Sequence, residues 1–81
     1  MNQQEAEKAL KNAKFEVGQR VYHENRREWV TITHVGISEK RWHDYGIIEV
    51  DYIATSEKTG SGCWGYENDF SESALTRWAG W

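Results

Sequence analysis

The sequence predicts an all-β fold, a small barrel of four to five antiparallel strands preceded by a short helix or a frayed leader. From Phe15 onward, apolar and polar residues alternate with a period of two, as they do along half-buried strands. Turn-forming residues interrupt this alternation roughly every eight to twelve residues, the spacing of small barrels. With 81 residues, the chain supplies too few strands for a longer sandwich.

The first 14 residues are predicted to form a leader, and residues 15–81 the barrel with an aromatic tail at its end. The leader is rich in helix formers, and four small or apolar residues share one helical face: Ala6, Ala9, Leu10 and Ala13. Because that face is small, a helix here is marginal by itself, and a frayed segment is the alternative.

The barrel strands are predicted near residues 17–23, 28–37, 46–55 and 62–67, followed by a short helical turn near 71–76. Between the second and third strands, Ser38 to Gly46 is expected to be a long charged loop. The alternation predicts which side chains share a face. In the second strand, one face is predicted to carry Trp29, Thr31, Thr33 and Val35. The opposite face is predicted to carry Val30, Ile32 and His34. In the third strand Ile48, Val50 and Tyr52 point inward and Glu49 and Asp51 outward; in the fourth, Trp64 and Tyr66 oppose Cys63.

Composition and charge narrow the function classes. The formal net charge is −3, whereas domains that bind through phosphate contacts are usually strongly basic, so nucleic acid is disfavoured as a partner. Cys63 is the only cysteine and fits a reducing compartment. The N-terminus lacks the apolar run of a signal peptide, and no stretch approaches the roughly 20 apolar residues of a membrane span. A cytoplasmic protein with no membrane partner is expected.

Four stretches in order resemble the Src-homology-3-like (SH3-like) small barrels. These are Val17, Gly18 and Val21; Val35 and Gly36; Glu49 to Ile53; and the aromatic strand that runs from Trp64 toward Leu75. The group includes Tudor-like and KOW-like modules and small phage- or plasmid-type proteins, and the resemblance covers residues 15–77. It implies an accessory protein of bacterial or phage origin. It also implies a ligand groove between the early loops and the aromatic strand.

The residues that could carry chemistry favour a non-catalytic protein. His23, His34, His43 and Cys63 are scattered without the spacing of metal ligands, so neither a metal nor another cofactor is expected. Cys63 lies in a strand among aromatics, where a buried structural thiol is predicted. Glu49 and Asp51 fit a solvated strand face as well as they fit a pair of catalytic carboxylates.

The number of aromatic residues predicts a binding surface. The interior is expected to hold Phe15, Val21, Trp29 or Ile32, Ile48, Val50 and Leu75. Some of the other large side chains must therefore lie outside: Tyr22, Trp42, Tyr45, Tyr52, Trp64, Tyr66, Trp78 and Trp81. We expect Tyr66 in the groove and Trp64 in its wall. The Ser38–Gly46 loop is dense in contact-capable residues. The predicted partner-binding residues are Trp42, Tyr45, Tyr66, Tyr22 and Arg41.

The resulting hypothesis is an adaptor module that recognises a protein or peptide partner through an aromatic groove. One alternative is a nucleic-acid-associated module that uses Arg20, Arg26, Arg27, Lys40 and Arg41 around Trp42. Another is an oligomeric pore enzyme similar to the plasmid-type dihydrofolate reductase. Its V-Q-I-Y motif would correspond to Cys63–Tyr66, although Trp64 and Gly65 depart from it. The exposed aromatics could instead cover an interface between two copies of the chain, which makes a homo-oligomer the further alternative.

Overall fold

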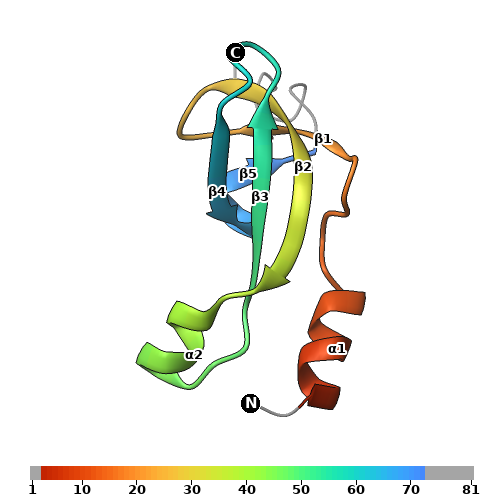
Figure 1. Cartoon of the computed structure of the whole chain (residues 1–81), viewed down its shortest axis with the longest axis vertical. Helices are drawn as coiled ribbons and strands as arrows, with labels where there is room; N and C mark the ends of the chain where they lie inside the picture. Colours follow the sequence, from red (N-terminus) through yellow and green to blue (C-terminus); the bar gives the residue numbers. More distant parts are fainter. Residues whose placement is uncertain (1–2, 73–81) are drawn as a thin grey trace.

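Five antiparallel strands form one sheet that curls into a half-barrel, with one helix before it and a short helix between its second and third strands (Figure 1). The computed structural model describes residues 3–72. In chain order the elements are α1 (Gln3–Lys11), β1 (Arg20–His23), β2 (Glu28–Ile37), α2 (Glu39–Tyr45), β3 (Val50–Ser56), β4 (Gly62–Tyr66), the 3₁₀ turn η1 (Glu67–Asp69) and β5 (Phe70–Ser71). The predicted small all-β fold with a short N-terminal helix is confirmed.

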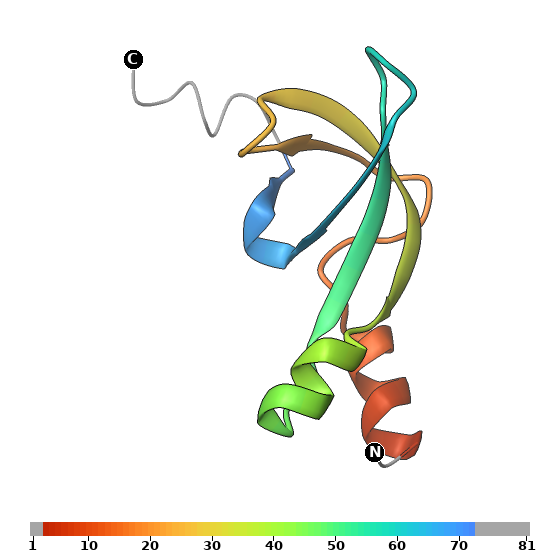
Figure 2. The same ribbon diagram turned by 60° about the vertical axis from the view of Figure 1, so that its left-hand side comes forward.

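The strands lie in the order β4-β3-β2-β1-β5. The first four form a meander in which each strand pairs with the next, and β5 returns across the open side to pair with β1 at Tyr22–Ser71 and His23–Phe70. η1 makes the connection from β4 to β5, and the backbone amide of Glu24 donates to the carbonyl of Asp69 at 3.0 Å. Figure 2 shows the curl that results, with α1 and α2 at one end of the sheet.

The hydrophobic core fills the inside of this curl. Its buried members are Phe15, Val21, Val30, Ile32, Tyr52, Ala54, Cys63 and Phe70. The rings of Phe15, Tyr52 and Phe70 meet edge to face, with Phe15 and Tyr52 centroids 5.3 Å apart. The Tyr52 hydroxyl accepts from the backbone amide of Lys14 at 3.1 Å, so this buried polar group is satisfied.

The buried residues agree only in part with the predicted core. Tyr52 is fully buried, although it was also counted among the aromatics that could lie outside, whereas Trp29 is only half-buried on the outer face. Trp64 was not predicted in the core, and it keeps 51% of its surface exposed. Ile48 is half-buried and precedes β3. The predicted core residue Leu75 lies outside the described residues.

The predicted facing of β2 is wrong after Ile32. Ile32 pairs with Ala54 and His34 with Ile53, so one extra residue, Thr33, interrupts the register. A bulge of this kind reverses the alternation of side chains beyond it. His34 is therefore exposed, and Val35 packs against the core instead.

The first and third strands are shorter than predicted. The chain turns over Glu16–Gln19, where the amide of Gln19 donates to the carbonyl of Glu16 and Gly18 adopts a φ of 91°. β1 therefore begins at Arg20 instead of near residue 17. β3 begins at Val50 instead of near residue 46, because residues 47–49 lead from α2 into the sheet.

The segment predicted as a long charged loop forms the helix α2 over most of its length. Ser38 caps it, since the Ser38 hydroxyl accepts from the backbone amide of Arg41 at 3.2 Å. Gly46 ends it in the left-handed region, with φ 67° and its amide donating to the carbonyl of Trp42. Ser38 and Gly46 are the start and stop signals of this helix in the sequence. The many charged residues between them predicted a loop instead.

Most of the helical turn predicted near 71–76 lies outside the described residues. Ser71 belongs to β5, and residues 73–76 lie outside the described residues. Within the described residues, a 3₁₀ turn that was not predicted follows β4 at η1, where a carboxylate oxygen of Asp69 accepts from the backbone amide of Tyr66 at 2.8 Å.

Candidate functional site

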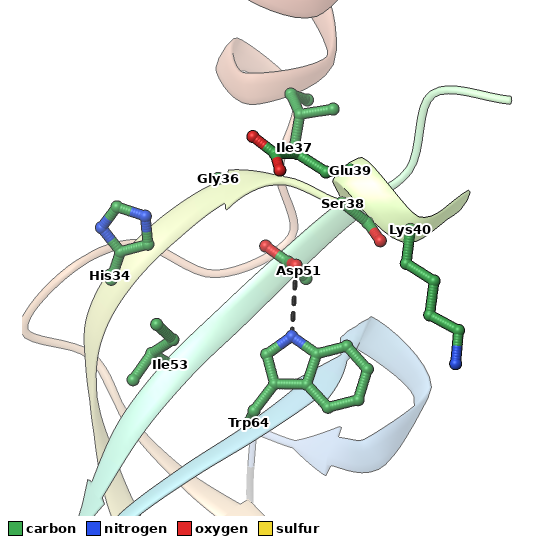
Figure 3. A pocket seen from close by; sticks show the side chains of 9 residues that line it. All are labelled: His34, Gly36, Ile37, Ser38, Glu39, Lys40, Asp51, Ile53 and Trp64. Carbon is green, nitrogen blue, oxygen red and sulfur yellow. Dashed lines mark hydrogen bonds between the residues drawn. The ribbon is translucent and has the colours of Figure 1, made fainter. Parts of the chain in front are cut away.

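Two adjoining hollows lie where α2 meets the outer face of the sheet. The first, here called the tyrosine cleft, has a volume of about 260 Å³ and is lined by Lys40, Arg41, Tyr45, Trp64 and Tyr66. The second, here called the His34 hollow, has a volume of about 480 Å³ and is lined by the end of β2, the start of α2 and the outer faces of β3 and β4 (Figure 3). Lys40 and Trp64 line both, so the two form one continuous surface.

Strand register brings the sheet residues of this surface together. Ile53 of β3 lies opposite His34 of β2 on one side and opposite Trp64 of β4 on the other. One step along, Asp51 lies between Gly36 and Tyr66. All of these positions face away from the core, because Tyr52 and Ala54, their neighbours in β3, face into it.

Hydrogen bonding holds the indole of Trp64 in place while leaving its ring exposed. The indole Nε1–H donates to a carboxylate oxygen of Asp51 at 3.1 Å (Figure 3). Gly36 has no side chain to fill the floor of the hollow, and a Cβ there would lie 3.0 Å from Nε2 of His34. With its polar atom already bonded, Trp64 offers a ligand an aromatic surface.

The guanidinium of Arg41 contacts two tyrosine rings. Its central carbon is 4.7 Å from the centroid of Tyr66 and 5.6 Å from that of Tyr45. Nε of Arg41 is shielded from solvent and lies 3.2 Å from a carboxylate oxygen of Glu49, but without the alignment of a hydrogen bond. Stacking and ion pairing together restrict this side chain to one orientation.

The hydroxyl of Tyr66 connects α2 to β4. It lies 3.1 Å from the hydroxyl of Ser38, the residue that caps α2. The interaction with Tyr66, opposed by the cost of burial, raises the pKa of Arg41 above its already high ordinary value. The guanidinium therefore keeps its positive charge at any physiological pH.

The structure brings together three of the five predicted partner-binding residues: Arg41, Tyr45 and Tyr66. Trp42 is half-buried on α2 and lines neither hollow. Tyr22 lies on β1, which two strands separate from β4, and its ring is 5.5 Å from that of Trp29.

Sequence analysis placed Trp64 in the groove wall but did not assign His34, Asp51 or Ile53 to the ligand surface. These residues and Trp64 come from three strands and lie side by side only because of the register that follows the bulge in β2. A period-two pattern places each residue on a face, but it does not say which residues of neighbouring strands are opposite one another. Lys40 was expected in the contact-capable Ser38–Gly46 loop and in the nucleic-acid alternative, but not among the predicted partner-binding residues.

The other basic residues of that alternative are distributed over the opposite end of the sheet. Arg20 pairs with Glu57 at 2.7 Å and lies 4.1 Å over the ring of Trp29. Arg26 approaches Glu28 at 3.1 Å. Arg20 and Arg26 thus belong to ion pairs, and Arg27 lines a separate hollow with Arg20 and Trp29, away from Lys40 and Arg41.

The described residues include no group of three metal-ligating side chains. Cys63 is buried in β4, and this burial raises the pKa of its thiol, an effect that the charge of Arg26 partly offsets. A thiol held in its neutral form is a poor nucleophile. Glu49 and Asp51 have different partners, Arg41 and Trp64, and so do not act as one carboxylate pair.

Comparison with known proteins found no matching family model, no matching curated protein and no matching solved structure. Within residues 3–72, no helix is long and apolar enough to cross a membrane. The fold and the surface beside Trp64 thus define a small all-β half-barrel with an exposed aromatic and basic surface.

Proposed function

We propose that the chain is a small non-catalytic module that binds an extended protein or peptide segment along the tyrosine cleft and the His34 hollow. The observation that carries this proposal is the exposure of large rings beside oriented polar groups. Tyr45 is 66% exposed and Trp64 51% exposed, around an arginine that is already held in place. Grooves that recognise extended peptides use rings in this way, and aromatic residues and arginine dominate binding energy at interfaces.

We also propose that the half-barrel is SH3-like. The resemblance expects an aromatic strand that runs into a short helical turn, and β4, which carries Trp64 and Tyr66, runs directly into η1. The return of β5 to pair with β1 supports the same assignment. Fold alone does not imply a ligand, so the function rests on the surface beside Trp64.

A selection of peptides tests the function directly. The full chain is immobilised and used to select twelve-residue peptides from a phage-displayed random library. The dissociation constants of enriched peptides are then measured for the unmodified chain, for Trp64→Ala and for the control Trp29→Ala. Trp29 is a second outward-facing tryptophan on the sheet that lines neither proposed hollow.

We expect Trp64→Ala to weaken binding by about 2 kcal/mol, roughly 30-fold, as at interface hot spots. Trp29→Ala should leave binding within about twofold, since this residue lies outside the surface. Failure to enrich any peptide over the Trp64→Ala background would refute the proposal. Equal loss in the two variants would also refute it, because it would place binding elsewhere or reflect general unfolding.

A further inference from the structure

We infer that the segment recognised by this surface carries a carboxylate side chain next to an apolar side chain. Arg41 and Lys40 would hold the carboxylate, and Trp64 with Ile53 would hold the apolar group. This inference rests on the proposed function and names the chemistry of the partner.

The side chain of Arg41 is oriented to bind a planar anion. The rings of Tyr45 and Tyr66 lie against its guanidinium, and its Nε is shielded from solvent. The side chain still keeps 36% of its surface exposed, so the donors that a ligand can reach are its terminal Nη groups. Parallel N–H donors of this kind bind a carboxylate through two hydrogen bonds.

Lys40 supplies a second positive charge at the junction of the two hollows. Figure 3 shows its side chain extending alongside Trp64. Within the described part of the chain, no carboxylate forms an ion pair with Lys40. An acidic ligand would therefore gain a partner for this ammonium group without breaking an existing pair.

An apolar subsite lies directly beside these cations. Ile53 and Trp64 face each other across β3 and β4, and both are exposed, by 42% and 51%. The indole N–H of Trp64 is already bonded to Asp51, so a ligand meets ring carbons there and no unsatisfied donor. Burial of a leucine-sized side chain on this surface would remove apolar area from water on both partners.

The negative charges around the surface favour a carboxylate over a phosphate. Glu39 and Asp51 line the His34 hollow, and Glu49 partly neutralises Arg41. A phosphate monoester carries about −1.5 to −2 charges near pH 7 and would be repelled by these groups more strongly than a carboxylate. A carboxylate, with a single negative charge, meets less of this repulsion and can still pair with Lys40 and Arg41.

Four oriented libraries of nine-residue peptides test this inference against the immobilised full chain. Their fixed central pairs are Glu-Leu, Gln-Leu, Lys-Leu and phosphoserine-Leu. We expect Glu-Leu peptides to be retained at least about tenfold more than Gln-Leu peptides, the range of a charge-assisted hydrogen bond. In Lys40→Glu the preference should move toward Lys-Leu. The control Lys58→Glu makes the same charge change at an exposed residue of the β3–β4 turn and should keep the original preference.

The outcomes separate the inference from the function on which it rests. Equal retention of Glu-Leu and Gln-Leu peptides, still abolished in Trp64→Ala, would overturn the carboxylate and leave the binding module intact. The carboxylate would also be overturned if phosphoserine-Leu peptides were retained most strongly. The same holds if Lys40→Glu kept the preference for Glu-Leu peptides. If no library binds the unmodified chain better than Trp64→Ala, both the inference and the proposed function fail.

Discussion

Successive residues of β4 alternate between the outer face, which carries the proposed binding surface, and the core. Trp64 is exposed on the outer face, while its neighbours Cys63 and Gly65 face the core. Gly65 lies where the sheet meets η1, and a Cβ there would be 2.9 Å from Cβ of Asp69 and 3.2 Å from Cε2 of Phe70. The glycine thus permits the approach of η1 that closes the half-barrel.

Gly65→Ala is expected to destabilise the fold by about 1–3 kcal/mol, because the added methyl forces η1 and Phe70 away from β4. In a domain of this size that corresponds to a fall in melting temperature of roughly 4–20 °C. Thermal unfolding followed by circular dichroism measures it.

Gly62→Ala in the same strand is the matched control. A Cβ at Gly62 would meet its nearest neighbour, the carbonyl oxygen of Ala54, at 4.0 Å. This change should alter the unfolding free energy by less than about 0.5 kcal/mol. If both variants unfold at the same temperature, the close contact at Gly65 does not limit stability.

At the scale of elements, α2 depends on one buried hydroxyl. Ser38 is 1% exposed, accepts from the amide of Arg41 and bonds with the hydroxyl of Tyr66. The same atom therefore starts the helix and attaches it to β4. The helix in turn carries Lys40, Arg41 and Tyr45 to the tyrosine cleft.

Ser38→Ala should cost about 1–3 kcal/mol, since the helix loses its cap and the hydroxyl of Tyr66 loses its partner. Urea unfolding gives the free energy, and affinity for the selected peptides should fall as well. Ser61→Ala, at an exposed position in the β3–β4 turn, is the control and should change neither quantity. An unchanged stability in Ser38→Ala would mean that α2 does not need this cap.

At the scale of the whole molecule, stability comes from the curled sheet and the segment that enters it. None of the residues of α1 is buried. Phe15, by contrast, is 2% exposed, and its ring contacts Tyr52 and Phe70. The half-barrel should therefore fold without the helix that precedes it.

Removal of residues 1–11 is expected to lower the unfolding free energy by less than about 1 kcal/mol, because no residue of α1 is itself buried. Phe15→Ala in the full chain should cost about 3–5 kcal/mol through loss of the ring and the cavity left behind. Urea denaturation of both proteins measures the difference. A loss of more than about 2 kcal/mol on truncation would show that α1 is part of the cooperative unit.

The sequence by itself determined the fold class, the antiparallel strands and the burial of Cys63, because the period-two alternation from Phe15 onward is compatible with little else. It also indicated that Arg41, Tyr45 and Tyr66 belong together. Only the tertiary structure decided which strand residues join them. The extra residue at Thr33 reverses the alternation in β2, and strand register then sets His34, Ile53 and Trp64 side by side. Such pairings join residues far apart in the chain, and a local pattern contains no information about distance across strands.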